Sequence, residues 1–388
     1  MGIKILHLYH SNFKHESRML KESKSLGRVP YIDKIYIGAM KDAETEERET
    51  LDSKTSVWRV PVKMRILKKG VAANFLKMGE WTARLLWGFR REPIALVQCH
   101  SLMCLPICVL FKILKGSKLV YDCHELETER ASGSASLRKV EKIVEAILIR
   151  FVDYTIVVSN SIERWYRDRY RLRNIRVIIN VPYRSAARPV QSNVLRDHFN
   201  IPFGDTIFIY QGLLSGARGI EILLRVFSAL PFQKHIVFMG YGELKEEIQD
   251  HERRFPNIHF LPAVPPDRVT DYTAGADIGI SLIEDVCLSY YYCLPNKVFE
   301  YILAGLPVIV SDFPDMAAVI DEYQCGWKTP VNEVGVADLI NHLTPAAILE
   351  KRERALASYE KFSWEDEELK LINIYDELLL RKKAAASG

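Results

Sequence analysis

The chain has 388 residues and 48% hydrophobic content, which is enough for two ordinary hydrophobic cores. Its formal net charge is only +4, and its seven cysteines form no CxxC pair, which excludes a disulfide-stapled secreted scaffold. The charge is divided unevenly: residues 1–185 hold 34 Lys and Arg against 20 Asp and Glu, and residues 186–388 hold 19 against 29. The first half is expected to face an anionic partner, but no nucleic-acid-binding motif is present, so no nucleic-acid partner is predicted.

Strand-like segments alternate with helix-like segments through the first half. No signal peptide precedes the first strand, so a cytoplasmic location is expected. The expected strands are Lys4–Tyr9, Ile94–His100, Lys118–Cys123, Asp153–Ser159 and Arg176–Ile179. This alternation predicts a parallel sheet covered by helices on both faces.

Two basic segments of the first half also carry aromatic side chains. Met64–Arg91 mixes seven Lys and Arg with Trp, Phe and Leu, and is interpreted as a helix lying in the headgroup layer of an anionic membrane. The alternative is a helix that packs its apolar side on the sheet, and this alternative is favoured for Arg164–Arg176. The apolar run Leu102–Leu114 is too short for a membrane span and predicts a core helix.

The segment Val181–Asn193 contains two prolines and several small polar residues, which is typical of a linker between domains. After it, Thr206–Gln211 predicts a buried strand that runs into a turn with Gly212, Gly216 and Gly219. Such a turn lets the backbone approach a phosphate closely, and Arg218 is its only cation.

The next strand, His235–Met239, ends in Gly240-Tyr241-Gly242. The third glycine of a GxGxxG motif would fall at Lys245, so the dinucleotide-binding fingerprint of dehydrogenases is not met. The turn nevertheless lies at the carboxyl end of a parallel strand, where open α/β sheets bind their ligands.

The segment Leu294–Asp312 predicts a helix opened by Pro295, stopped at Gly305 and followed by a buried strand. The start of a helix presents unpaired N–H groups and a partial positive charge, which suits a phosphate. Lys297 adds a full positive charge there, and Glu300 can accept hydrogen bonds from ribose hydroxyls. Together with the two glycine turns, this segment predicts a nucleotide site.

With these motifs the second half resembles the donor domain of family 4 glycosyltransferases, which have the GT-B fold, retain anomeric configuration and use nucleotide sugars. Arg218-Gly219 stands where that family has a Lys-Gly phosphate-binding pair, and Glu300 matches the second glutamate of its two-glutamate motif. Two positions depart from the family pattern. Leu213 replaces a common arginine, and Tyr292 stands where the first glutamate is expected, while Lys297 matches a bacterial subgroup with a PxK pattern.

The resemblance implies two Rossmann-like domains whose parallel sheets face each other across a cleft. Residues 1–185 would bind the acceptor, residues 186–362 the donor, and residues 363–388 would form a helix crossing back to the first domain plus a tail. His124 is expected beside the donor sugar, as a catalytic residue with Arg218 and Lys297; its alternative role is a bond to a local backbone carbonyl. The acceptor would contact Ser11, Asn12 and His15, and the donor would contact Gly212, Gly240, Tyr241, Gly242, Asn296, Val298 and Glu300.

The resulting functional hypothesis is a retaining transferase that moves a sugar, from UDP as the expected carrier, to a lipid-linked or growing polysaccharide acceptor at the inner face of a bacterial membrane. No cofactor and no metal are expected, because the cysteines have no zinc-ligand spacing and no Asp-x-Asp pair occurs. Two alternatives stay open. One is a nucleotide-sugar 2-epimerase of the same fold, with His124, Glu284 or Asp285 as acid and base. The other is a sugar-nucleotide-binding scaffold that has lost activity.

Overall fold

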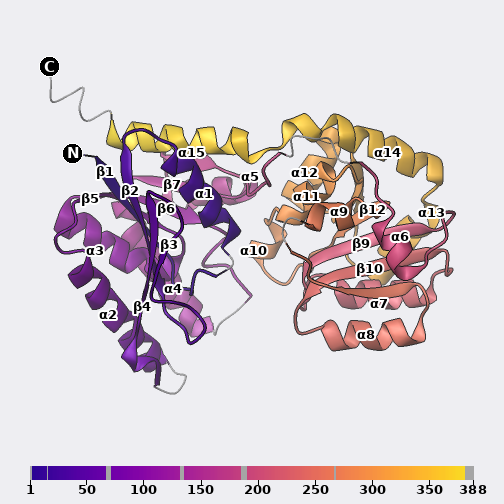
Figure 1. Ribbon diagram of the computed structural model, residues 1–388, viewed down its shortest axis with the longest axis horizontal. Coiled ribbons are helices and arrows are strands. Elements are labelled where there is room, and N and C mark those ends of the chain that lie inside the picture. The colour runs from indigo at the N-terminus through magenta and orange to yellow at the C-terminus, as the bar shows by residue number, and fades with distance from the viewer. Residues whose placement is uncertain are drawn as a thin grey trace. The chain divides into compact units, whose positions relative to one another are not determined.

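The computed structural model describes residues 2–14, 16–66, 71–131, 135–184, 190–265 and 268–380, with the backbone alone at 65, 66 and 71–75. Its contacts divide the chain into two compact units, residues 1–179 with 367–388 and residues 180–366. The sequence places these divisions after residues 185 and 362. Each unit is a parallel sheet wrapped by helices (Figure 1).

The first unit contains an eight-stranded sheet in the order β3-β4-β2-β1-β5-β6-β7-β8. Every neighbouring pair of strands is parallel except β3 and β4. Its strands are β1 Ile3–Leu8, β2 Ile32–Met40, β3 Arg48–Thr50, β4 Thr55–Val60, β5 Ile94–Cys99, β6 Lys118–Cys123, β7 Tyr154–Val157 and β8 Ile175–Val177. Five of these agree with the expected strands to within a few residues, whereas β2, β3 and β4 are not among the predicted elements.

Helices cover both faces of this sheet. On one face, the hydroxyl of Tyr121 donates to Glu145 of α4, and on the other Asp122 accepts two hydrogen bonds from Arg18 of α1. The helix α15, Trp364–Leu379, shares the α1 face, where Tyr375 donates to Gln98. The remaining elements of the unit are α1 Ser17–Gly27, η1 Lys63–Ile66, α2 Val71–Gly88, η2 Leu102–Cys104, α3 Leu105–Lys115, α4 Ala135–Leu148, η3 Ile149–Phe151 and α5 Asn160–Tyr170.

Described parts of both basic segments pack in the first unit. In α2, Trp81, Leu85 and the following Phe89 are buried, and Trp81 donates its indole N–H to the carbonyl of Ala39. These three aromatic and aliphatic residues are therefore core residues, which contradicts the membrane interpretation for them, whereas Leu76 and Trp87 of the same segment are exposed. In α5, Tyr166 and Tyr170 donate to Glu145, as the packed alternative predicts.

The second unit contains a six-stranded parallel sheet in the order β11-β10-β9-β12-β13-β14. Its strands are β9 Thr206–Leu213, β10 Lys234–Tyr241, β11 Ile258–Pro262, β12 Ile278–Ser281, β13 Val308–Ser311 and β14 Gly326–Thr329. Its helices are α6 Val194–Phe199, α7 Ile220–Ala229, α8 Lys245–Arg254, α9 Val269–Thr273, α10 Leu288–Tyr291, α11 Asn296–Leu303, α12 Pro314–Tyr323, α13 Glu333–His342, α14 Pro345–Ala357 and η4 Tyr359–Lys361. Because all the strands are parallel, the turns after β9, β10 and β12 meet at the carboxyl edge.

Within the described residues, no helix combines the length and the apolar character that a bilayer crossing requires.

Candidate functional site

The turn between β9 and α7 has a backbone that only particular residues allow. Gly212 and Gly219 have φ angles of 111° and 71°, and Ala217 has a φ of 60°. A Cβ on Gly219 would lie 2.6 Å from Leu282 Cβ, so both conformation and space require glycine there. The turn thus holds Arg218 between two left-handed residues.

Side-chain and backbone contacts fix this turn against the loop that follows β12. Arg218 Nε donates to Ser215 Oγ at 3.1 Å. The N–H of Gly219 donates to a carboxylate oxygen of Glu284 at 3.2 Å, and the N–H of Glu284 donates to the carbonyl of Ala217 at 3.1 Å. The N–H of Gly219, at the N-cap of α7, therefore already has Glu284 as its acceptor.

The second predicted cation, Lys297, lies in the first turn of α11 and is buried, with 8% of its surface exposed. Its Nζ has no hydrogen-bond partner among the residues that the structure describes, and it lies 3.6 Å from the centre of the Tyr210 ring. Burial, followed by the nearby Arg218 guanidinium, lowers the pKa of Lys297 to about 7, against the opposing influence of Glu300 and the Cys293 thiol. The charge of Arg218 thus acts on Lys297, and a buried ammonium with no hydrogen-bond partner among the described residues favours an anion beside it.

The start of α11 has no side-chain cap and no acidic residue in its first turn. Pro295 stands at the N-cap, one residue before the first helical position that the sequence predicts for it. Asn296 is exposed, whereas Val298 is fully buried and its N–H donates to the carbonyl of Pro295 at 3.1 Å. Of these two predicted donor contacts, only Asn296 has an accessible side chain.

Glu300 faces Gln211 at the end of β9. Gln211 Nε2 donates to Glu300 Oε2 at 2.5 Å, and Gln211 Oε1 accepts a hydrogen bond from Thr273 Oγ1 at 2.7 Å. The N–H of Gln211 donates to the hydroxyl of Tyr301 at 2.9 Å. These hydrogen bonds hold the Glu300 carboxylate through its Oε2 atom. Its Oε1 atom has no hydrogen bond within the described residues, so it can accept one from a ligand hydroxyl.

The two glycines at the end of β10 have a packing role. Gly240 pairs with Gly212, and a Cβ on Gly240 would lie 1.9 Å from the Gly212 carbonyl oxygen. A Cβ on Gly242 would lie 2.1 Å from the carbonyl oxygen of Leu214. These clashes require glycine at both positions whether or not a ligand binds there. The Tyr241 side chain between them is exposed.

The predicted histidine of the first unit, His124, belongs to a buried network of charged side chains. Its Nε2 lies 3.2 Å from His100 Nδ1 and 3.4 Å from Asp122 Oδ2. Asp122 is held in two hydrogen bonds by Arg18, and Arg18 together with His124 keeps the pKa of Asp122 well below its usual range although burial opposes this. His124 is thus held by side chains, and the bond to a local backbone carbonyl, its alternative role, is absent from its described contacts.

The predicted acceptor residues lie in the loop between β1 and α1. Ser11 donates to Glu16 at 3.0 Å, and Asn12 donates to Asp42 at 2.5 Å. Both side chains thus stabilise the loop, and His15 lies outside the described residues. Phe13 and Lys14 of the same loop border a cavity of about 380 Å³.

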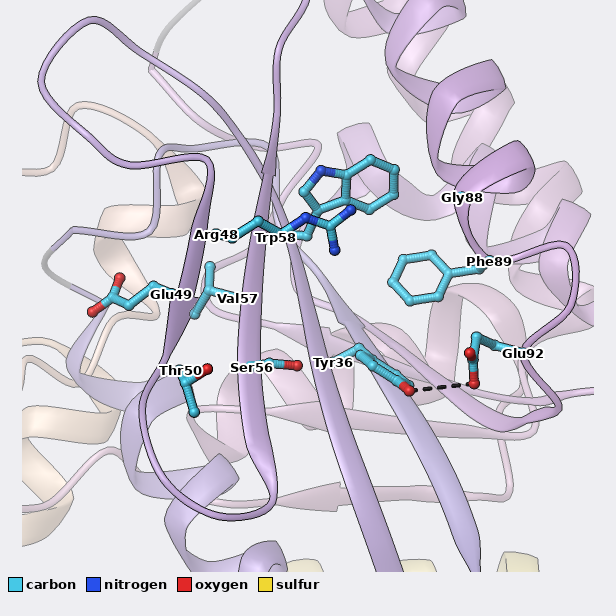
Figure 2. A pocket seen from close by; sticks show the side chains of 10 residues that line it. All are labelled: Tyr36, Arg48, Glu49, Thr50, Ser56, Val57, Trp58, Gly88, Phe89 and Glu92. Carbon is cyan, nitrogen blue, oxygen red and sulfur yellow. Dashed lines mark hydrogen bonds between the residues drawn. The ribbon is translucent and has the colours of Figure 1, made fainter.

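A further cavity of about 240 Å³ lies between β3, β4 and the end of α2 (Figure 2), at the same edge of the sheet, and Glu49 lines both cavities. Its charged groups are already paired, since Arg48 stacks over Trp58 at 4.5 Å and Glu92 accepts from Lys4 and Tyr36. None of the predicted site residues lines it. The cavity therefore offers no alternative catalytic group.

The sequence does not single out Glu127, Gln211, Thr273 or Tyr210. Glu127 follows β6 and is buried, and desolvation raises its pKa to about 8 although Arg130 opposes this. Gln211 ends a strand that was predicted, but its pairing with Glu300 depends on the order of β9 beside β12, which no local motif encodes.

Two family models match the chain: Glycosyltransferase Family 4 over residues 34–181 and Glycosyl transferases group 1 over residues 205–344. Among curated proteins, the chain is similar to a chitobiosyldiphosphodolichol beta-mannosyltransferase of Eremothecium gossypii, with 26% identity over 279 residues, 63% of this chain and 58% of that protein. A protein of the same description from Candida glabrata is 23% identical over 281 residues, 63% of this chain and 61% of that protein. The chain thus spans about three fifths of the length of these relatives.

Solved structures resemble the chain over almost its whole length. Sucrose-phosphate synthase from Thermosynechococcus elongatus has a TM-score of 0.78 at 15% identity, covering 97% of this chain and 99% of that one. Anabaena HepE in complex with UDP-glucose has a TM-score of 0.73 at 16% identity, covering 97% and 100%. WaaG, described as a glycosyltransferase involved in lipopolysaccharide biosynthesis, has a TM-score of 0.66 at 14% identity, covering 95% and 99%. The chain therefore contains a family 4 glycosyltransferase domain followed by a group 1 glycosyltransferase domain, and it has the GT-B fold.

Proposed function

We propose that this protein is a glycosyltransferase whose second unit binds the diphosphate of a nucleotide sugar between Arg218 and the start of α11. The observation that carries the proposal is the buried ammonium of Lys297, which has no hydrogen-bond partner among the described residues and whose pKa the charge of Arg218 helps to lower. A diphosphate placed there would pair with both cations and restore the full charge of Lys297. The same cations would stabilise the negative charge that develops on the leaving diphosphate.

Glu300 would hold the ribose through the carboxylate oxygen that Gln211 leaves open. We propose UDP as the carrier, because UDP and UDP-glucose are bound by HepE, a neighbour of the same fold. The donor site would lie at the carboxyl edge of the second sheet, where Gly240 and Gly242 let the ends of β9 and β10 approach each other.

We infer that the acceptor is lipid-linked and that the protein works on the inner face of a membrane. The support is that the relatives are named for transfer to a diphosphodolichol-linked sugar, and that WaaG is described as acting in lipopolysaccharide biosynthesis. A role in bacterial surface glycan assembly, at a cytoplasmic membrane surface, extends this proposal. The stereochemical course we propose is retention, with His124 contacting the transferred sugar.

No metal is needed in this proposal, because two fixed cations neutralise the diphosphate. Two groups of possible ligands, which share His100, lie in the described part of the first unit, but Arg18 pairs with the carboxylate of each, Glu22 in one and Asp122 in the other. Transfer should therefore proceed unchanged in EDTA. Loss of transfer in EDTA with recovery on adding Mg²⁺ or Mn²⁺ would contradict a metal-free site.

The test of the function is a donor and acceptor screen. Thermal shift with UDP-, GDP-, ADP- and CMP-sugars identifies the donor, and product analysis with polyprenyl-diphosphate-linked saccharides then identifies transfer. Incubation with UDP-N-acetylglucosamine alone separates the alternatives: rapid epimer formation would establish an epimerase, whereas slow hydrolysis fits a transferase. Glu284, a candidate acid or base for epimerisation, is occupied by the Gly219 N–H. Nucleotide binding without turnover on any acceptor would favour the scaffold.

A further inference from the structure

Two neighbouring helices of the first unit expose apolar side chains on their outer sides. On α3, Ile113 is 61% exposed and Leu114 is 66% exposed, and on α4, Ile143 is 59% exposed and Ile147 is 55% exposed. Together with the exposed side chains of Leu110, Leu137 and Val140, they form what we call the α3–α4 face. The outer side of a surface helix is normally polar, so a gathering of this kind marks an interaction surface.

The exposed residues are aligned by helical spacing and by packing. Val140, Ile143 and Ile147 recur every three or four residues, which places them on one side of α4. Helices α3 and α4 are in contact and cover the same face of the sheet, the face opposite to α1. Their outer sides therefore point away from the sheet in a common direction.

The end of α2 extends this surface beside α3. Trp87 is 69% exposed, and the guanidinium of Arg90 lies 4.1 Å from the centre of its ring. Lys115, at the end of α3, donates to the carbonyl of Arg90 at 3.2 Å, which holds the two helix ends together. An exposed tryptophan with an arginine on its ring is the residue pair that an interface between water and lipid favours.

The charge of the surface decides what it fits. Helix α3 contains no acidic residue, and the two acids of α4 are both engaged. Glu141 faces Arg130 at 3.7 Å, and Glu145 is buried and accepts from three tyrosine hydroxyls. In α3, α4, η3 and residues 87–91, all of which the structure describes, the exposed charged side chains are cations: Lys139, Arg150, Arg90 and Arg91.

From this combination we propose that the α3–α4 face docks on the headgroup layer of an anionic lipid bilayer. The aliphatic side chains would enter the boundary between headgroups and acyl chains, and the cations would lie at lipid phosphates. A second copy of the same face would instead bring cations against cations. The inference rests on the proposed function only in that a lipid-linked acceptor would lie in the same bilayer, since docking itself needs no nucleotide.

The test is vesicle flotation of the full chain. Wild-type protein should float with phosphatidylcholine vesicles that contain phosphatidylglycerol and should stay unbound with phosphatidylcholine alone. Ile143→Glu with Ile147→Glu should reduce the bound fraction by about tenfold or more, because charged side chains would enter the apolar boundary. Lys139→Gln with Arg150→Gln should weaken binding and reduce its sensitivity to salt.

The matched control is Val334→Glu with Leu349→Glu, two exposed apolar residues of the second unit, which should float like the wild type. Equal flotation of all variants, no flotation of the wild type, or a dimer in light scattering that the Ile143→Glu and Ile147→Glu changes abolish would each overturn the proposal. Unchanged circular dichroism shows that the variants are folded. A UDP-induced thermal shift separately reports the nucleotide site, so failure of that site leaves the flotation result intact.

Discussion

The ammonium of Lys297 lies 3.6 Å from the centre of the Tyr210 ring and has no hydrogen-bond partner in the described part of the chain. A ring face attracts a cation, but it does not replace the hydrogen bonds to water that burial removes. The free protein thus carries an unfavourable interaction that an anion would relieve. Stability and ligand binding should therefore oppose each other at this residue.

The first prediction concerns stability without ligand. The pKa of Lys297 falls from 10.5 to about 7 on folding, so the folded state binds fewer protons than the unfolded state between these pH values. The destabilisation is full below pH 7 and fades as the pH rises toward 10.5. Lys297→Met should raise the free energy of unfolding by roughly 2–4 kcal/mol at pH 6.5 and by much less near pH 10. Urea unfolding at both pH values measures the free energy of unfolding. A Lys297→Met variant that is no more stable than the wild type at pH 6.5 would show that the buried lysine does not destabilise the folded protein.

The second prediction concerns the other cation. Arg218→Gln should weaken UDP binding by about one to two powers of ten, because a charge-assisted hydrogen bond contributes roughly 1.5–3 kcal/mol. Arg225→Gln is the matched control on the following helix, since Arg225 is exposed and pairs with Glu333. Titration calorimetry compares the two variants. If both variants bound UDP with equal affinity, Arg218 would not be part of the UDP site.

The third prediction separates ribose recognition from phosphate recognition. Glu300→Ala should weaken UDP binding by about tenfold and leave inorganic pyrophosphate binding almost unchanged, because a carboxylate that accepts hydroxyl hydrogen bonds has no role toward pyrophosphate. Arg218→Gln should weaken both ligands. Since Gln211 loses its partner in the alanine variant, Glu300→Gln serves as the second variant. Weaker pyrophosphate binding in both Glu300 variants would mean that Glu300 maintains the structure of the site and does not recognise the ribose specifically.

The fourth prediction concerns the approach of β9 and β10. Gly240→Ala should destabilise the protein by about 2 kcal/mol or more, because its Cβ would lie 1.9 Å from a backbone oxygen and backbone must move. Gly79→Ala in α2 is the control, with no atom within 4 Å of the added Cβ. It should be neutral or stabilising by about 0.5–1 kcal/mol. Thermal unfolding of both variants tests this, and a harmless Gly240→Ala would show that the glycine is kept for another reason.

The buried strands and the glycine turns could be predicted from the sequence because both are local signals. β1, β6, β9 and β13 are short apolar runs, and Gly219 reflects a left-handed backbone next to Leu282. β2 was missed because Asp33 and Lys34 interrupt its apolar pattern, and β3 has only three residues. The fold class did not depend on these strands.

The composition of the site was less predictable. Arg218 was predicted from its turn after a strand, and Lys297 and Glu300 from the start of a helix, but the burial of Lys297 against Tyr210 depends on packing between β9 and α11. The pairing of Gln211 with Glu300 and Thr273 likewise joins three elements that are distant in sequence. Met64–Arg91 was assigned to a membrane because its aromatic residues look the same whether they face lipid or, as Trp81 does, the core.

The most direct test of the central claim is calorimetric titration of UDP at pH 8 in two buffers with different ionisation enthalpies. Lys297 is mostly neutral at that pH in the free protein, and a bound diphosphate should restore its proton. The expected result for the wild type is uptake of a substantial fraction of a proton on binding, with no uptake and about tenfold or weaker affinity in Lys297→Met. Binding of equal affinity without proton uptake in both proteins would contradict a diphosphate site at Lys297.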